Sequence, residues 1–211
     1  MSKYSSNHDG THTASIDGSG AMASVSEHVA EGLLRFFLDR RRIFKDTTKI
    51  LDVGAGMGYL QKVFEECTKK HYDVYSVEGY GPLEFVANPE KRIIADFTKP
   101  LSSEYHKDFD LVISFECVEH VPENMQSKFW ENIFYCSDLA LVGIHVMGHE
   151  NTAHCCIRSP KWWSTFFEEK NIKIKKIYST PGVPWTDKAG NVVTPWECSV
   201  IYLLEKKQED E

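Results

Sequence analysis

Strand-like and helix-like patterns alternate along the chain from residue 25 onward. Apolar runs typical of buried strands end near Val53, Glu78, Asp96, Phe115 and Met147, and two more strand patterns occupy 172–179 and 198–206. Helical spacing of apolar residues occupies 25–42, 59–67, 124–135 and 160–170. Such alternation predicts an α/β fold with a mainly parallel seven-stranded sheet and helices on both faces. No helix separates the last two strands, which predicts an antiparallel edge strand.

The two ends of the chain lack this pattern. Residues 1–24 are rich in Ser, Gly, His and Thr, so we expect a flexible N-terminal arm that becomes more ordered when a ligand binds. Residues 205–211 are acidic and are expected to be a solvated tail. The 180 residues between them, 25–204, are an ordinary length for one domain.

Composition narrows the class of protein. The chain has 211 residues and a net charge of −7, which argues against a broad nucleic-acid surface because such surfaces depend on clustered Lys and Arg. No apolar run reaches the ~20 residues of a membrane span, and the N-terminus lacks a secretory apolar core. We therefore expect a soluble cytoplasmic protein. The six cysteines form no CxxC pair and are expected to be reduced.

A glycine turn follows the first predicted strand. Gly54, Gly56 and Gly58 form a GxGxG pattern that leads directly into a helix, which lets a ligand approach the backbone closely. The spacing differs from the GxGxxG of dinucleotide sites. Glu78 ends the next strand, 20 residues later, where a carboxylate can accept both hydroxyls of a ribose. Asp96 ends the third strand and is placed to accept from an adenine amino group, with Phe97 beside it to stack on the ring. Together these residues predict a nucleoside site.

This arrangement resembles the class I S-adenosylmethionine-dependent methyltransferases. The matching stretches, in that family's order, are ILDVGAGMGYL, VEGY, ADF and FDLVISFECVEHVPE, within about residues 48–123. The resemblance implies a Rossmann-like methyltransferase domain over 25–204 that binds S-adenosylmethionine. It also implies that the three glycines line the cofactor, that Asp52 lies near its amino group, and that Glu78, Asp96 and Phe97 hold the ribose and adenine. Glu116, after the fourth strand, is a further cofactor-binding candidate.

The fourth strand leads into an acidic and histidine-containing motif. Glu116, Glu119 and His120 follow an E-x-x-E-H pattern, and a helical turn there would place all three on one face beside the cofactor's sulfonium. Their side chains suit Mg²⁺, Mn²⁺ or Zn²⁺. His149 and His154 are candidates for a fourth ligand, and His145 lies just before them, where a purely structural role in the strand is the alternative.

The motif is similar to one in two branches of the family, the small-RNA 3′-terminal ribose 2′-O-methyltransferases and the ubiquinone-pathway O-methyltransferases. The later loop, HCCIRSPKWW, resembles that of small bacterial and phage methyltransferases. The resemblance favours His154 as the fourth ligand and implies catalytic roles for Glu119, His120 and His154. It also implies that a divalent ion holds two adjacent hydroxyls of the acceptor.

The acceptor is left open by the sequence. We expect O-methylation of a small hydroxylated or sugar-like molecule, because the chain is acidic and carries no appended RNA-binding module. One alternative is a metal-free N- or carboxyl-methyltransferase in which Glu119 and His120 shape the pocket. Others are 2′-O-methylation of RNA and a non-enzymatic, cofactor-binding regulatory partner. The sequence does not indicate the oligomeric state.

Overall fold

The computed structural model describes residues 4–6, 12–14, 27–39, 44–68, 71–79, 85–146, 154–178, 185–186, 192–193 and 199–207. Its helices are α1 (Glu27–Asp39), α2 (Tyr59–Cys67), α3 (Glu123–Cys136) and α4 (Pro160–Glu169), with the 3-10 helices η1 (Pro89–Lys91), η2 (Ser103–Tyr105) and η3 (Val118–His120). The main strands are β3 (Lys49–Val53), β4 (Asp73–Glu78), β5 (Arg92–Ile94), β6 (Leu111–Phe115), β7 (Leu139–His145), β8 (Ile172–Tyr178) and β11 (Ser199–Lys206).

These strands form one seven-stranded sheet in the order β5-β4-β3-β6-β7-β11-β8. The five strands from β5 to β7 are mutually parallel, whereas β11 is antiparallel to both of its neighbours. The predicted antiparallel pairing at one edge is confirmed. The strand that reverses direction is β11, which lies one position in from the edge, and β8 is the edge strand.

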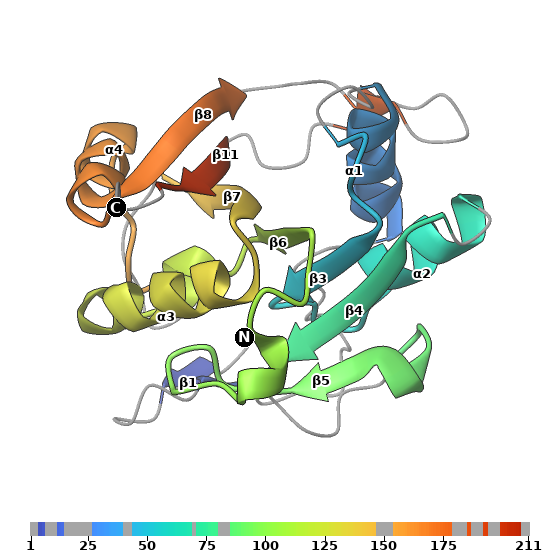
Figure 1. The fold of residues 1–211 in the computed structure, drawn as a ribbon, viewed down its shortest axis with the longest axis horizontal. Helices are drawn as coiled ribbons and strands as arrows, with labels where there is room; N and C mark the ends of the chain where they lie inside the picture. The colour runs from blue at the N-terminus through green and yellow to red at the C-terminus, as the bar shows by residue number, and fades with distance from the viewer. Residues whose placement is uncertain are drawn as a thin grey trace.

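Helices cover both faces of the sheet, as predicted. In Figure 1, α3 and α4 lie to the left of the strands and α1 and α2 to the right. The α3/α4 side buries a cluster of large aromatic rings, with Trp130, Trp163, Phe167 and Tyr202 among its members. The α1/α2 side buries a second cluster that includes Leu33, Phe36 and Phe64. The sheet is therefore sandwiched between two apolar layers, the arrangement that parallel strands require.

The central strands are buried along their whole length. All five residues of β6 are buried, and in β3 only the first residue is partly exposed. Continuous burial explains why these strands read as apolar runs rather than as alternating patterns. The edge strand β8 is instead buried only at its two end residues, and its exposed lysines Lys173 and Lys175 form ion pairs with Glu205 of β11. Charged side chains on an edge strand protect it from pairing with another chain.

The structure adjusts several predicted boundaries. Strand β5 ends at Ile94, two residues before Asp96, and β11 continues to Lys206, so it includes the first two residues of the expected tail. Within the expected N-terminal arm, β1 (Tyr4–Ser6) pairs with β2 (His12–Ala14). A second small pair joins β9 (Trp185–Thr186) to β10 (Val192–Val193). Among the helices of the described ranges, none has the length and apolarity that crossing a bilayer requires.

Candidate functional site

The glycine turn between β3 and α2 has the backbone conformation that only glycine adopts readily. Gly54, Gly56 and Gly58 have φ angles of 78°, 55° and 83°. A Cβ atom on Gly54 would lie 2.5 Å from the Cys117 sulfur, and one on Gly58 would lie 2.4 Å from the ring of Phe85. The turn is therefore closely packed on two sides, and both its backbone angles and its neighbours exclude larger residues.

The carboxylate of Glu78 is bound to this turn. Its Oε2 accepts a hydrogen bond from the Gly56 amide at 2.9 Å, and its Oε1 accepts one from the Gly79 amide at 2.8 Å. The carboxyl ends of β3 and β4 are thus joined through a side chain that the sequence assigned to ribose binding. Each carboxylate oxygen can accept a second hydrogen bond, so the side chain keeps the capacity to accept from a ligand hydroxyl.

Asp52 lies just before the turn and is 3% exposed. Burial, and then the nearby charge of Glu78, raise the pKa of the Asp52 carboxyl to about 8. A cationic group beside this carboxyl would lower that pKa, because an opposite charge favours the ionised form. The position therefore suits the role near an amino group that the resemblance implied.

The third strand end differs from the prediction. Asp96 lies in a turn beyond β5, where its Oδ1 accepts hydrogen bonds from the amide and hydroxyl of Thr98, at 2.9 and 2.6 Å. Burial raises the pKa of Asp96, but the bonds from Thr98 and Lys99 outweigh it and lower the pKa overall. Phe97 is 6% exposed and packs in the core on Phe129, and its contact with the adenine stays a prediction.

A different aromatic ring lies against the glycine turn. Phe85 follows β4, and the amide of its neighbour Val86 donates to the Met57 carbonyl at 2.9 Å, which fixes this segment on the turn. The guanidinium of Arg92 lies 5.0 Å from the Phe85 ring centroid. No sequence motif singled out Phe85, because its position depends on a contact between segments that are distant in the sequence.

The E-x-x-E-H segment does not form the predicted helical face. Glu116 has a φ angle of 52°, and η3 begins only at Val118, so Glu116 approaches Glu119 through a bend. Ser199 Oγ donates a 2.7 Å hydrogen bond to Glu116 Oε1, and His145 Nδ1 lies 3.8 Å from Glu116 Oε2. His145 is thus directed at Glu116 from the end of β7.

Glu119 lies between two groups of side chains and is fully buried. Ligand atoms of Glu119, His120 and His154 all lie within 4.8 Å of one another, and the same limit holds for Glu116, Glu119 and His145. Neither carboxylate oxygen of Glu119 has a hydrogen-bond partner in the described part of the chain. Burial, and then the charge of Glu116, raise the pKa of Glu119 well above its usual range.

The loop that carries His154 is attached to the same segment. The Cys156 amide donates to the Glu119 carbonyl at 3.0 Å, and Cys155 Sγ contacts the His120 carbonyl at 3.2 Å. The rings of His120 and His154 are 4.7 Å apart between centroids. Burial, and then the charge of His145, lower the pKa of His154, which favours the neutral imidazole that ligates metals. His149, the other candidate, lies outside the described residues.

Comparison with known proteins places this geometry in a family. Residues 23–173 match the family described as Methyltransferase domain, which is more than half of the chain. The chain belongs to this methyltransferase family. Its fold is that of the class I S-adenosylmethionine-dependent enzymes, since its structural neighbours share the sheet. No curated protein matches the sequence.

Three of the similar solved structures indicate the range of that fold. A Burkholderia thailandensis 1,6-didemethyltoxoflavin-N1-methyltransferase with bound S-adenosylhomocysteine has a TM-score of 0.58 at 13% identity, covering 91% of this chain and 82% of its own. A Synechocystis PCC 6803 magnesium protoporphyrin IX methyltransferase with bound SAM has a TM-score of 0.57 at 12%, covering 86% and 79%. The small RNA methyltransferase HEN1 has a TM-score of 0.57 at 12%, covering 85% of this chain, which spans only 26% of HEN1.

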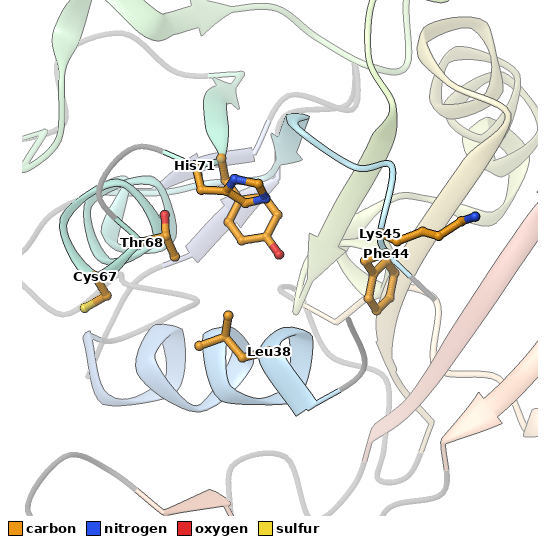
Figure 2. Close-up of a pocket in the computed structure, with 7 residues that line it drawn as sticks. Leu38, Phe44, Lys45, Cys67, Thr68 and His71 are labelled. Carbon is orange, nitrogen blue, oxygen red and sulfur yellow. The ribbon is translucent and has the colours of Figure 1, made fainter. Parts of the chain in front are cut away.

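A cavity of about 620 Å³ lies elsewhere in this methyltransferase (Figure 2). Its lining comes from the ends of α1 and α2 and from the segments that precede β3 and β4, namely Leu38, Phe44, Lys45, Cys67, Thr68, His71 and Tyr72. These residues lie at the amino ends of the strands, whereas ligands of open α/β sheets bind outside the carboxyl ends. The cavity is therefore separate from the glycine turn.

Proposed function

We propose that this methyltransferase transfers a methyl group from S-adenosylmethionine to a hydroxyl oxygen of a small hydroxylated or sugar-like molecule, with the assistance of a divalent metal ion. One observation carries the proposal. A glycine turn with a bound acidic partner and a buried, unpartnered carboxylate among histidines occupy the carboxyl edge of the same sheet. The glycine turn with its acidic partner suits the cofactor, and the buried carboxylate among histidines suits the acceptor.

The cofactor is assigned to the ends of β3, β4 and β5. The backbone of Gly54, Gly56 and Gly58 lets its methionine part approach, and Asp52 accepts from its amino group. Glu78 holds the ribose hydroxyls through the carboxylate that also accepts from the Gly56 and Gly79 amides. At the adenine, Asp96 is the acceptor that the resemblance implied, and the ring of Phe85 replaces Phe97 as the aromatic neighbour.

A divalent ion fits the donor set beyond β6. Glu119 offers two oxygens without hydrogen-bond partners, and His120 and His154 bring imidazoles within 4.8 Å of it. These three residues would hold the ion, with Glu116 beside them. When bound, a divalent ion lowers the pKa of a coordinated hydroxyl, which otherwise is a poor nucleophile at neutral pH. The protein fixes the positions of these residues, because one backbone hydrogen bond and one contact of the Cys155 sulfur with a backbone carbonyl join η3 to the loop that carries His154.

The methylated atom would be an alkoxide or phenolate oxygen that attacks the methyl carbon in line with the departing sulfur. The hydroxyl proton leaves to a nearby base or to solvent, and S-adenosylhomocysteine leaves with the sulfonium's electron pair restored. The lowered pKa of His154 keeps that ring neutral at pH 7, which is the form in which an imidazole can hold the ion. Vicinal diols and catechols are the acceptors that best match two adjacent oxygens on one ion.

Two readings compete with this proposal. A metal-free N- or carboxyl-methyltransferase would use Glu119 and His120 only to shape the pocket. An RNA 2′-O-methyltransferase would carry out the same transfer to a hydroxyl, but on a larger substrate. A cofactor-binding regulatory partner would bind S-adenosylmethionine and never produce S-adenosylhomocysteine. The net charge of −7 favours the small acceptor over RNA, because RNA binding requires phosphate neutralisation.

The test is a methyl-transfer assay of the full chain with S-adenosylmethionine labelled in the methyl group. Acceptors would be a panel of catechols, sugars, carboxylates, amines and a short RNA, each with added Mg²⁺, Mn²⁺ or Zn²⁺ and each with EDTA. We expect transfer to a diol or catechol that EDTA abolishes. Transfer that is insensitive to EDTA, or transfer to nitrogen, would contradict the metal-assisted proposal. Glu119→Ala and His154→Ala should be inactive, and the exposed-site control Glu90→Ala should be fully active.

A further inference from the structure

We infer that Glu116, Glu119 and His145 form a second divalent-cation subsite, which shares the Glu119 carboxylate with His120 and His154. The inference deepens the proposed function and rests on it for the first ion. The second subsite adds Glu116 and His145, and the sequence motif did not assign His145 to a metal. Two ions bridged by one carboxylate are a common arrangement in enzymes, with ~3.5–4 Å between the ions.

The distances between ligand atoms carry the argument. The ligand atoms of each group lie within 4.8 Å of one another, and Glu119 belongs to both groups. His145 Nδ1 and Glu116 Oε2 are 3.8 Å apart, too far for a direct hydrogen bond. Two ligands at about 2.1 Å from one ion can be at most roughly 4.2 Å apart. The pair is therefore spaced as ligands of a common ion, and the widest pairs need to close by less than about 1 Å.

The surrounding structure holds this subsite in place. Ser199 donates to one oxygen of Glu116, which leaves the other directed toward His145. Ser199 and His145 are register partners on the paired strands β11 and β7, so the sheet sets their separation. Glu116 has a left-handed backbone conformation, with a φ of 52°, that costs a non-glycine residue free energy. A strained backbone conformation of this kind is kept only where the surrounding structure enforces it, and such positions are often found at ligand-binding sites.

The electrostatics of the cluster also point to a cation. Glu116 and Glu119 lie together with little exposure, and both oxygens of Glu119 lack a hydrogen-bond partner among the residues that the structure describes. Burying two adjacent carboxylates is costly, and His145 faces only Glu116, so one ion against each group would compensate both carboxylates. Ligands of two carboxylates and one imidazole suit Mn²⁺ or Zn²⁺ better than Mg²⁺, which prefers oxygen alone.

The experiment is a titration of the full chain with Mn²⁺, without cofactor or acceptor, followed by electron paramagnetic resonance and by metal analysis after gel filtration. We expect two Mn²⁺ per chain with a spin-coupled signal. His145→Gln should bind one Mn²⁺ with an uncoupled signal, and so should His154→Gln. Glu119→Gln should weaken both ions at least tenfold. His71→Gln, at an exposed histidine at the opposite end of the strands, is the matched control and should keep two.

Two results would overturn the inference. One is a single uncoupled Mn²⁺, or none, in the wild-type chain. The other is unchanged stoichiometry and coupling in His145→Gln. Circular dichroism and the thermal midpoint identify a variant that fails to fold, and Ser199→Ala gives a second route, since it should weaken the second ion alone. Binding of S-adenosylhomocysteine tests the proposed function separately, because the glycine turn does not belong to the group of residues that the Mn²⁺ titration probes.

Discussion

The two halves of the site, at the ends of β3 and β4 and at the ends of β6 and β7, differ in how their carboxylates are satisfied. Glu78 is engaged by two backbone amides, so the cofactor half is already organised by the chain. Glu119 is fully buried with no partner for either oxygen within the described ranges, although histidines surround it. Hydrogen bonds within the chain therefore organise the first half, whereas the second half holds a buried carboxylate that lacks a hydrogen-bond partner among the described residues.

This difference has a physical origin in the neighbours of each carboxylate. A glycine turn exposes amide groups that can donate, and Gly56 uses one of them on Glu78. The segment after β6 presents Glu119 to another carboxylate and to histidines. Desolvation without compensation raises the pKa of Glu119, so stability and ligand binding are opposed at that end of the sheet.

The largest expected effect is on the cofactor half. Glu78→Ala removes the acceptor of two amide bonds and of the ribose hydroxyls, and charged hydrogen bonds of this kind contribute roughly 1.5–3 kcal/mol each. We expect the Kd for S-adenosylhomocysteine to rise about 100-fold, measured by calorimetry. The surface variant Glu90→Ala should leave it unchanged. An equal loss in both variants, or none in Glu78→Ala, would mean that Glu78 does not organise this half.

A smaller effect is expected from the glycine turn itself. Gly58→Ala places a Cβ 2.4 Å from the Phe85 ring at a φ of 83°, so we expect the free energy of unfolding to fall by about 2 kcal/mol. Gly79→Ala is the matched control, because a Cβ there meets nothing within 4 Å. Urea unfolding of both variants measures the difference. Equal stability of the two would show that the turn is looser than its contacts indicate.

The smallest expected effect is a change in the free energy of unfolding on substitution of Glu119, and it distinguishes the two halves of the site most clearly. Its folded pKa is raised, so the stabilisation from the protonated form is present at low pH and is lost as the pH rises through that folded pKa. In EDTA we expect Glu119→Gln to be more stable than wild type at pH 7 by roughly 1 kcal/mol, with a flatter pH profile, because it removes a buried charge.

Added Mn²⁺ should reverse this order, since only the wild-type chain gains stability from the ion. Thermal unfolding between pH 4 and pH 8, with and without the ion, measures both effects. A Glu119→Gln variant that is less stable than wild type in EDTA would contradict the comparison, because it would mean that the Glu119 carboxylate already has a compensating partner.

The sequence was sufficient for the features that depend on neighbours along the chain. The helix over 59–67, the strand over 111–115, the glycine turn and the acidic end of β4 are where the pattern predicts them. Turn chemistry and burial are local there, so the residues themselves carry the signal.

Features that depend on contacts between residues far apart in the sequence could not be predicted from local patterns. The helical face expected at Glu116 is absent because that residue is held in a left-handed conformation beside Ser199, 83 residues away. Phe85 lies against the glycine turn because the segment after β4 folds back on it, a contact that no local pattern predicts. His145 has the pattern of an ordinary strand residue, and only the parallel pairing of β7 with β6 brings it to Glu116.

The most direct test of the central claim is a calorimetric titration of the wild-type chain with S-adenosylhomocysteine in EDTA. The cofactor half is organised without an ion, so we predict one site per chain with a Kd in the micromolar range, about −8 kcal/mol. Binding should persist when Mn²⁺ is added. Absence of binding under both conditions would contradict the account, because the glycine turn and Glu78 would then be structural features alone.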